Sequence, residues 1–345
     1  MYESNTQAVS DTLAAASSEV FSQDVINDIL SLVATPTNPT IVVETLEVAD
    51  NGTVNVAPGT ELLFVKTSDT EVTKVAVNAD APAVFFQGNG GVDATIGSAP
   101  ANANGGSSAA VADADAIQRF VVGTAGADTI TIVDGKNTQV IAGDKDVIKA
   151  GSGHTVVIAA QGSSTVVGGA DTIVQTRGDD EDFTITVENG HAKIANAATG
   201  ISVDLSGVQY VQLDNSEALI FAANEKQAVV ANLYQTVLGR TAEYAGLEFW
   251  FEMADKGVAL NAIAQGFINS AEYQLGSLNN DQFVDALYNG VMGRDGDAAG
   301  MDFWTDVLEA GVSRADVITA FAVAATNDSN EVDVVGTVTI IPGLV

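Results

Sequence analysis

Hydrophobic positions follow different periods in different parts of the chain. Over residues 9–33 the apolar side chains recur three and four positions apart, which predicts helix. Residues 40–96 instead hold short β-branched runs such as TIVVETLEV and ELLFV, which predict strands. From residue 225 onward the helical period returns. The pattern predicts an α+β chain built from several distinct parts.

The first two parts are bounded by turn-forming residues. We expect an N-terminal helical segment over 1–38 and a small antiparallel β domain over 39–97. Asn51-Gly52 and Pro58-Gly59 separate apolar runs in that domain and are typical of hairpin turns. The stretch SAPANANGGSSAAVADADA then predicts a linker of small residues over 98–117.

A nine-residue repeat begins with GTAGADTI at 123–130. Steps of nine bring into register Asp128, Asn137, Asp146, Thr155 beside His154, and Ser164, and Asp171 falls slightly early. Aliphatic residues follow most of these positions by two, at Ile130, Ile148, Val157, Val166 and Ile173. Glycines precede them, at Gly126, Gly135, Gly143, Gly153, Gly162 and Gly169. One such unit is weak evidence, but a register carried through five positions indicates a repeat architecture.

This section resembles the calcium-binding nonapeptide G-G-x-G-x-D-x-aliphatic-x of repeats-in-toxin proteins. The resemblance implies a parallel β-roll in which each nine-residue unit is half a turn and Ca²⁺ lies between consecutive turns. Glycine suits a turn that needs positive φ, and aspartate supplies the hard oxygen ligand that calcium prefers. The candidate metal-site residues are Gly126, Asp128, Gly143, Asp146, Asn137, Gly169 and Asp171.

Turns eighteen residues apart should stack on one edge of the roll. Asp128 and Asp146 therefore share an edge with Ser164, while Asn137 and Asp171 share the other with His154 or Thr155. Several turns carry Asn, Thr or Ser where the motif has Asp, so only the Asp128–Asp146 pair looks like a full site. The alternative is a calcium-free β-solenoid in which the glycines merely shape the turns.

The repeat stops after residue 175, and alternating strands with a turn at Asn189-Gly190 follow over 183–222. They resemble the antiparallel cap that follows β-rolls in repeats-in-toxin proteins, with DLSGVQYVQLDN similar to the usual cap sequence. We therefore interpret 118–224 as a degenerate calcium β-roll with a β cap.

A longer repeat occupies 225–328, as two copies over 225–276 and 279–328. LYQTVLGRTAEYAGLEFW starts at Leu233 and LYNGVMGRDGDAAGMDFW at Leu287, an offset of 287 − 233 = 54 residues. The periodicity predicts all-α helical hairpins in which Tyr234, Phe249 and Trp250 pack together, with Tyr288, Phe303 and Trp304 packing likewise in the second copy. The pair resembles domain of unknown function 4214, a module that often follows β-rolls in bacterial secreted and surface-layer proteins.

Polar residues in these repeats have plain structural explanations. Arg240 and Arg294 are expected to hold their loops through carbonyls or a carboxylate, and binding of an anionic ligand is the alternative. Asp297 is better explained as a helix N-cap than as part of an EF-hand loop, since the twelfth-position glutamate is missing. Trp250 and Trp304 are expected in the core rather than stacked on a sugar.

Composition excludes several classes of function. Among 345 residues, 13 Lys and Arg face 45 Asp and Glu, giving a formal net charge of −32. Such a chain repels nucleic acid and anionic lipid and attracts divalent cations. Without cysteine there is no thiolate nucleophile or disulfide. The sequence contains no run of about 18 apolar residues, so membrane insertion is not expected. It also contains no catalytic motif that would supply a nucleophile and a base.

The chain ends are interpreted together. The N-terminal residues lack the basic start of an export signal, and the first basic residue is Lys66. Residues 329–345, ending EVDVVGTVTIIPGLV, are a candidate C-terminal signal for the type I secretion machinery, and a final β-strand is the alternative.

We expect a secreted or cell-surface bacterial protein that binds Ca²⁺, has no enzymatic activity, and acts structurally in a surface layer, matrix or adhesive assembly. Its expected partners are other copies of itself or other surface components. Two alternatives stay open. One is an accessory or carrier module of a secreted enzyme or effector, and the other is a small-ligand or glycan-binding module built on the helical repeats.

Overall fold

The computed structural model describes residues 1–16, 23–34, 40–48, 52–78, 81–98, 116–169, 171–327 and 338–340. The chain forms two compact units, Met1–Val208 and Gln209–Leu344. The first unit holds most of the β structure and two helices, and the second holds the remaining helices with three short strands.

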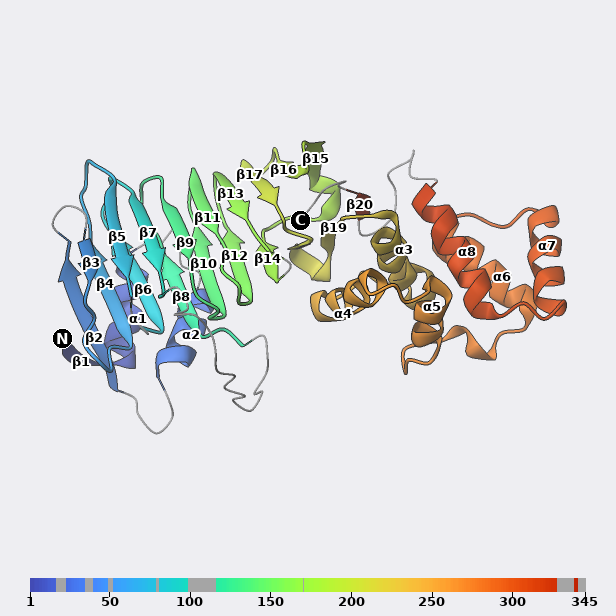
Figure 1. Cartoon of the computed structure of the whole chain (residues 1–345), viewed down its shortest axis with the longest axis horizontal. Helices are drawn as coiled ribbons and strands as arrows, with labels where there is room; N and C mark the ends of the chain where they lie inside the picture. Colours follow the sequence, from blue (N-terminus) through green and yellow to red (C-terminus); the bar gives the residue numbers. More distant parts are fainter. Residues whose placement is uncertain are drawn as a thin grey trace. The chain divides into compact units, whose positions relative to one another are not determined.

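The first unit is a β-roll whose chain alternates between two sheets (Figure 1). One sheet contains, in spatial order, β1 (Tyr2–Asn5), β2 (Thr40–Glu47), β4 (Leu62–Lys66), β6 (Ala83–Gln87), β8 (Arg119–Val122), β10 (Thr138–Ala142), β12 (Thr155–Ala159) and β14 (Thr172–Gln175). The other contains β15 (Phe183–Glu188), β16 (His191–Asn196), β17 (Ile201–Ser206), β13 (Ser163–Val167), β11 (Asp146–Lys149), β9 (Thr129–Ile132), β7 (Val92–Ile96), β5 (Thr73–Val77) and β3 (Gly52–Val54). These parallel strands in two open sheets, together with the helical region, confirm the predicted α+β fold class with a parallel β-solenoid.

Strand register confirms the spacing of the nonapeptide repeat. In one sheet Val147 pairs with Thr129 on one side and with Thr165 on the other, so each coil there takes eighteen residues. In the other sheet Thr138 pairs with Thr155, a step of seventeen. The shorter step explains why Asp171 falls early in a strict nine-residue register.

Aliphatic side chains fill the interior of the roll. Ile130, Ile148, Val157 and Val166 are fully buried, as their place two residues after the turn positions predicts. In β14, however, Val174 rather than Ile173 pairs with Val157. The residue of β14 that lies beside Val157 is therefore one position later in the sequence than the motif suggests.

The expectation of a small antiparallel β domain over 39–97 is wrong. The strands of this region pair in parallel: β2 with β4, β4 with β6, β3 with β5 and β5 with β7. They are further coils of the same roll. The turn at Pro58-Gly59, where Gly59 has φ +84°, joins strands of opposite sheets instead of closing a hairpin. A turn signal marks a change of direction, but it does not specify which neighbour the next strand will pair with.

The small-residue linker lies inside the roll. Residues 99–115 fall outside the described part of the chain, but strands on either side of them are neighbours. Ala83 of β6 pairs with Phe120 of β8, and Asp93 of β7 pairs with Thr129 of β9. The segment predicted to link two domains over 98–117 therefore interrupts one continuous stack.

Two N-terminal helices, as predicted for 1–38, pack against a face of the first sheet. α1 (Thr6–Ala16) and α2 (Gln23–Val33) bury Leu13 and Ile29 completely. Their apolar residues join one cluster with side chains of the first sheet: Ile41, Val43, Leu62, Phe64, Phe85, Phe120, Val122 and Ile141. The helices thus bury apolar residues on a face of the sheet that the interior of the roll does not cover.

The antiparallel cap begins with a hairpin, as predicted. β15 pairs with β16 across Asn189 and Gly190, which have φ +52° and +79°, as a tight hairpin turn with two positive φ values requires. β16 then pairs with β17, which returns to the parallel stack beside β13. A short 3₁₀ turn, η1 (Asp180–Asp182), precedes β15.

The second unit opens with the antiparallel pair β18 (Tyr210–Gln212) and β19 (Ala218–Ala222), joined by η2 (Asp214–Ser216). β20 (Val338–Ile340) pairs in parallel with β19, so this part of the tail is a strand. The rest of the predicted tail, 329–337 and 341–345, lies outside the described residues.

The helices of this unit form the two predicted repeats (Figure 1). They are α3 (Glu225–Leu233), the π-helical turn η3 (Tyr234–Leu238), α4 (Tyr244–Asp255), α5 (Leu260–Ile268), η4 (Leu275–Ser277), α6 (Asn280–Met292), α7 (Ala298–Glu309) and α8 (Arg314–Asn327). Gly239 and Gly293, 54 residues apart, cap η3 and α6 with φ +65° and +59°. Within the described residues, no helix has both the length and the apolar character needed to cross a bilayer.

Candidate functional site

Asp128 and Asp146 begin adjacent coils on the same edge of the roll. Asp146 is the first residue of β11, and Asp128 immediately precedes β9. Asp146 pairs with Ser164 in the next strand, as the eighteen-residue spacing predicts. Both carboxylates are almost fully buried, with about 1% of each residue exposed.

Every oxygen of these two carboxylates accepts a hydrogen bond. The Oδ1 of Asp128 accepts from the N–H of Val92 (2.7 Å) and the hydroxyl of Thr124 (2.6 Å), and its Oδ2 accepts from the N–H of Thr124 (2.5 Å). The Oδ1 of Asp146 accepts from the N–H of Asp128 (2.8 Å), and its Oδ2 accepts from the N–H of Gly143 (2.6 Å). Each aspartate therefore ties its own turn to the preceding coil.

Burial makes the two negative charges unfavourable. Burial raises the pKa of Asp128, against the lowering effect of its hydrogen bonds from Thr124 and Val92. Burial also raises the pKa of Asp146 to about 7, and the nearby charge of Asp128 adds to this increase. Binding of either a proton or a cation would relieve the repulsion between them.

The donor chemistry suits calcium, because two adjacent turns supply carboxylate oxygens. Asp128 and Asp146 are the residues that would hold the ion. Across the described chain, no group of three or more His, Asp or Glu side chains comes together in a way that could hold a metal. Further protein ligands at this pair would have to be backbone carbonyl or hydroxyl oxygens, and the Thr124 hydroxyl lies 2.6 Å from Asp128 Oδ1.

The predicted glycines have different roles. A Cβ on Gly126 would approach the N–H of Gly91 to 2.5 Å, so glycine permits close contact between neighbouring turns. Gly143 and Gly169 act as donors: Gly143 to Asp146, and Gly169 to the hydroxyl of Thr172 at 3.0 Å.

On the opposite edge, Asn137, His154 and Asp171 stack in the predicted order. Asn137 Oδ1 accepts from the N–H of His154 (3.2 Å), and the Nδ1 of His154 lies 2.7 Å from the Oδ1 of Asp171. The C=O of Asp171 accepts from the N–H of Thr155 (2.9 Å). These side chains hold adjacent coils together, and the tautomer of His154 decides which partner carries the proton.

Sequence reasoning missed the most buried ion pair of the roll. Arg119, with 1% of its side chain exposed, donates from Nη1 to Asp134 Oδ1 (3.2 Å) and from Nη2 to Oδ2 (2.6 Å). Arg119 pairs with Thr138 in the sheet and so occupies the position that Thr138, Thr155 and Thr172 hold in the following coils. The sequence signal that could have predicted this ion pair is an arginine at a strand position of an acidic chain.

Aromatic rings form matching clusters in the two helical repeats. Phe267 contacts both Tyr234 (centroids 4.8 Å apart) and Trp250 (5.2 Å). In the second copy Phe321 plays the same role between Tyr288 and Trp304, at 5.1 and 5.3 Å. The tryptophans thus pack against core rings, as predicted.

Two other rings point outward. Phe249 packs edge-on against Trp250, yet 51% of it is exposed, and its counterpart Phe303 is 58% exposed. The predicted three-ring packing of Tyr234, Phe249 and Trp250 is therefore replaced by one centred on Phe267.

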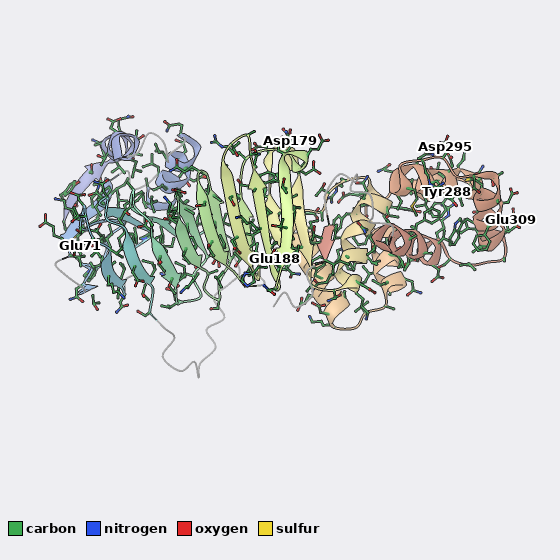
Figure 2. The ribbon with its side chains drawn as sticks, turned by 90° about the horizontal axis from the view of Figure 1, so that it is seen from above. Glu71, Asp179, Glu188, Tyr288, Asp295 and Glu309 are labelled. Carbon is green, nitrogen blue, oxygen red and sulfur yellow. The ribbon has the colours of Figure 1, made fainter. Side chains whose placement is uncertain are left out.

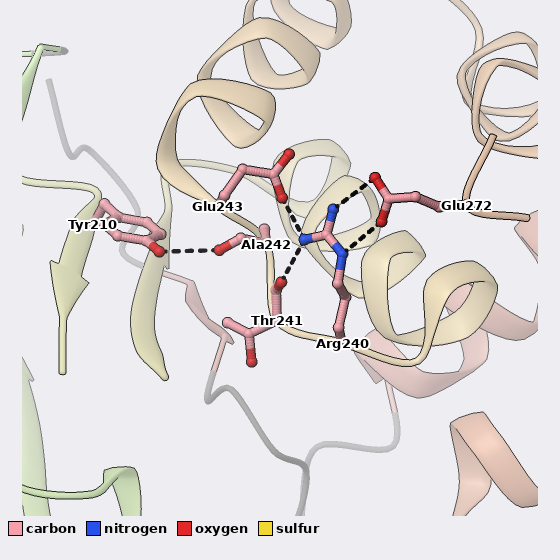
Figure 3. A network of polar contacts seen from close by, with 6 residues as sticks. All are labelled: Tyr210, Arg240, Thr241, Ala242, Glu243 and Glu272. Atoms are coloured by element: carbon pink, nitrogen blue, oxygen red, sulfur yellow. Dashed lines mark hydrogen bonds and ion pairs between the residues drawn. The ribbon is translucent and has the colours of Figure 1, made fainter. Parts of the chain in front are cut away.

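Arg240 holds the loop between η3 and α4, as predicted (Figure 3). It donates to both carboxylate oxygens of Glu272 (2.8 and 3.2 Å), to Glu243 and to the C=O of Thr241 (2.9 Å). The hydrogen bonds from Arg240 lower the pKa of the Glu272 carboxyl. Tyr210 donates to the C=O of Ala242 in the same loop (3.0 Å), and burial raises the pKa of its phenol to about 12.

The predicted N-cap of α7 is confirmed. Asp297 Oδ1 accepts from the N–H of Gly300 (2.8 Å), which satisfies a donor that the first turn of the helix leaves free. The carboxylate is therefore used locally in the described structure.

Comparison with known protein families gives a match in the region of the two helical repeats. The sequence model of the family described as "Domain of unknown function (DUF4214)" matches residues 221–276 and 264–330. The resemblance inferred for the two helical repeats is thus confirmed for this part of the chain. The comparisons with curated proteins and with solved structures give no match.

Proposed function

We propose that this protein is a noncatalytic structural protein that acts outside the bacterial cell by assembling into a surface layer, matrix or adhesive array. The observation that carries the proposal is the exposed sheet edge formed by β15. β15 is the end strand of its sheet, and within the described chain its only strand partner is β16. Its sequence, FTITVE, has strong strand propensity and no proline.

The geometry of the hairpin leaves donors free along this edge. Because a two-residue turn joins the strands, the flanking pair Glu188 and His191 exchanges hydrogen bonds, and the pairs alternate from there. The backbone N–H groups of Val187 and Ile185 therefore point away from β16. Such groups are ready to pair with a strand of another molecule.

Negative charge limits this pairing. The turn before β15 contains Asp179 to Asp182, and the strand ends at Glu188. Figure 2 shows Asp179 and Glu188 toward opposite ends of the strand. In antiparallel pairing of two such edges, each acidic end would approach the other molecule's acidic end. Divalent cations should relieve the repulsion in a chain of net charge −32.

The test is a calcium titration of the whole protein. We expect association, followed by light scattering, to increase at millimolar calcium and to reverse with EGTA. Sodium chloride at equal ionic strength is the control, because nonspecific screening would act equally in both salts. A protein that stays monomeric at every calcium concentration would contradict the proposed assembly.

We further propose that calcium stabilises the roll through Asp128 and Asp146. The support is the pair of buried carboxylates in consecutive coils, whose charges a cation would compensate. For a site filled at about ten times its dissociation constant, the expected stabilisation is about 1.4 kcal/mol. Melting of the full chain with calcium or EGTA measures this effect, and an Asp128→Asn, Asp146→Asn variant should not respond. An unchanged melting temperature in the native protein would exclude such a site.

Export through the type I secretion machinery belongs to the same proposal. Removing residues 331–345 should retain the protein inside cells. The truncation also removes β20, so the purified truncated protein must first show the circular dichroism of the intact helical repeats. Normal secretion of a folded truncated chain would count against a C-terminal signal.

A binding module built on the helical repeats is the second candidate function. It is favoured by the exposed rings of Phe249 and Phe303 at equivalent positions of the two copies. Exposed aromatic rings can stack on sugars. A glycan array with the Phe249→Ala, Phe303→Ala variant as control would test this alternative.

A further inference from the structure

The helical repeats place two arginines in the same local setting. Arg240 lies over the ring of Tyr234, 5.3 Å from its centroid, and Arg294 lies over Tyr288 at 5.6 Å. Each donates from Nη1 to the backbone carbonyl of the next residue, at 2.9 Å for Arg240 and 3.4 Å for Arg294. The shared glycine cap before each arginine fixes the start of the loop.

The copies differ in what faces the guanidinium group. In the first copy Glu272, in the segment after α5, binds Arg240 through both carboxylate oxygens, and Glu243 binds it from the loop. Glu272 is carried by the sequence Ser270-Ala271-Glu272-Tyr273. The first copy thus shows how a glutamate side chain binds the arginine at this position of the repeat.

The second copy lacks a counterpart of Glu272, and its carboxylate at the position of Glu243 serves as a helix cap. Glu243 is replaced by Asp297, whose Oδ1 caps the N-terminus of α7. Glu272 corresponds to Thr326, because 272 + 54 = 326. Thr326 lies within α8, where its hydroxyl accepts from Asn232 Nδ2 of α3 at 2.9 Å. Among the described residues Arg294 forms no ion pair, and its side chain is exposed.

We propose that Arg294, supported by the ring of Tyr288, is a receptor for a glutamate side chain presented by another polypeptide. The glutamate would bind as Glu272 binds Arg240, with two parallel N–H···O bonds. Arginine is suited to this role because its planar donors match a carboxylate. Figure 2 shows Tyr288 and Asp295, the residues that contact Arg294, in the second helical repeat. This site goes beyond the β15 edge and does not depend on it.

The test uses side-chain NMR of the full protein with a synthetic peptide as the probe. The peptide spans residues 268–275, INSAEYQL, with blocked ends, and a second peptide carries Gln in place of the glutamate. We expect the Nε–H signal of Arg294 to shift saturably with the glutamate peptide. The Arg240 signal should not move, because Glu272 already occupies that arginine. The glutamine peptide should bind about fivefold more weakly, as an exposed ion pair predicts.

Variants separate the alternatives. Arg294→Lys keeps the charge but loses the planar donors, so the peptide, followed here by its own NMR signals, should bind more weakly. Glu243→Gln in the first copy should leave peptide binding unchanged. A shift produced by oligogalacturonate and by neither peptide would replace the proposal with a glycan site. Peptide binding that appears only when Glu331 and Asp333 are changed to amides would overturn the proposal, because Arg294 of the native chain would then not receive a second polypeptide. Absence of any shift would overturn the proposal outright.

Discussion

Buried side chains at the turns of the roll accept N–H groups from a few residues earlier in the same turn. Four of them share this role: Thr73, Asp128, Asp146 and Thr172. Threonine and aspartate both supply the required acceptor, but only aspartate adds a buried charge. The turns that hold aspartate are therefore the ones sensitive to protons and cations.

Stability of the roll should depend on the protonation of Asp146. Its pKa in the folded protein is about 7, above the ordinary value of 3.8, so the native state holds an extra proton between these pH values. The free energy of unfolding should therefore fall as pH rises from about 4 to about 7, by at most about 4 kcal/mol. Asp146→Asn should flatten this slope, measured by urea unfolding and circular dichroism at each pH.

Asp144→Asn is the matched control. Asp144 is exposed, and hydrogen bonds from Ser163 and Lys145 lower its pKa to about 2. Its contribution is therefore present above pH 4 and is lost only as pH falls toward 2. The charge of Asp144 is the smallest of the causes that raise the pKa of Asp146, so the control should keep most of the native slope between pH 4 and 7. An equal slope in the Asp146→Asn variant would refute the assignment.

Gly97 should tolerate no side chain. It has φ +92°, and an added Cβ would collide with the carboxylate of Asp134, the partner of buried Arg119. Gly97→Ala should therefore cost about 3–5 kcal/mol by disturbing this pair, in addition to backbone strain. Gly59→Ala, with φ +84° and open space around the Cβ, should cost about 1–2 kcal/mol. Similar losses in chemical denaturation of the two variants would contradict the role of the ion pair.

Sequence predicted which residues share each edge of the roll, because register depends only on repeat length. Asp128 and Asp146 lie on one edge and Asn137 and Asp171 on the other, as expected. What these groups bond to was not predictable. The donor to Asp128 from the preceding coil is Val92, which lies 36 residues earlier, beyond an insertion that hides the repeat.

At the level of elements, α1 and α2 cover an apolar face of the first sheet. In β4 the residues Leu62 to Val65 are apolar and buried at four consecutive positions, because the sheet there is covered on both sides. Sequence analysis took these runs for a separate domain, since their coils lack the glycine repeat. The turn at Pro58-Gly59 was correctly located, but the partners of the strands around it were set by the stack, and Asn51 of the other predicted turn lies outside the described residues.

Truncating Ile29 in α2 should destabilise this contact. Ile29 is fully buried in the cluster with Leu13 and Phe64, so Ile29→Ala should cost about 2–5 kcal/mol. Asp28→Ala, on the exposed side of the same helix, should change stability by less than about 0.5 kcal/mol. Urea unfolding measures both values. A small loss for Ile29→Ala would show that the helix contributes little to holding the face.

At the scale of the whole molecule, a chain of net charge −32 should associate only where geometry offers strong pairing and charge is compensated. The β15 edge meets the first condition, and calcium is proposed to meet the second. The repeats predicted the helical region well, since a 54-residue offset is visible directly in the sequence. The free edge was not visible, because which strand of a cap lies outermost follows from the pairing of β17 with β13.

Blocking that edge should prevent assembly while leaving the hairpin intact. Val187→Pro removes a backbone N–H that points away from β16, so the ladder between the two strands keeps its bonds. We expect calcium-induced association to weaken at least about tenfold, because the edge loses a donor and cannot accept a straight partner strand. Val187→Thr alters the exposed side chain but keeps the donor, and it should associate like the native protein. Sedimentation velocity across a calcium series compares the three proteins. If Val187→Pro remains folded by circular dichroism and still assembles at the native calcium concentration, β15 is not the contact, and the remaining edges of the two sheets become the surfaces to test.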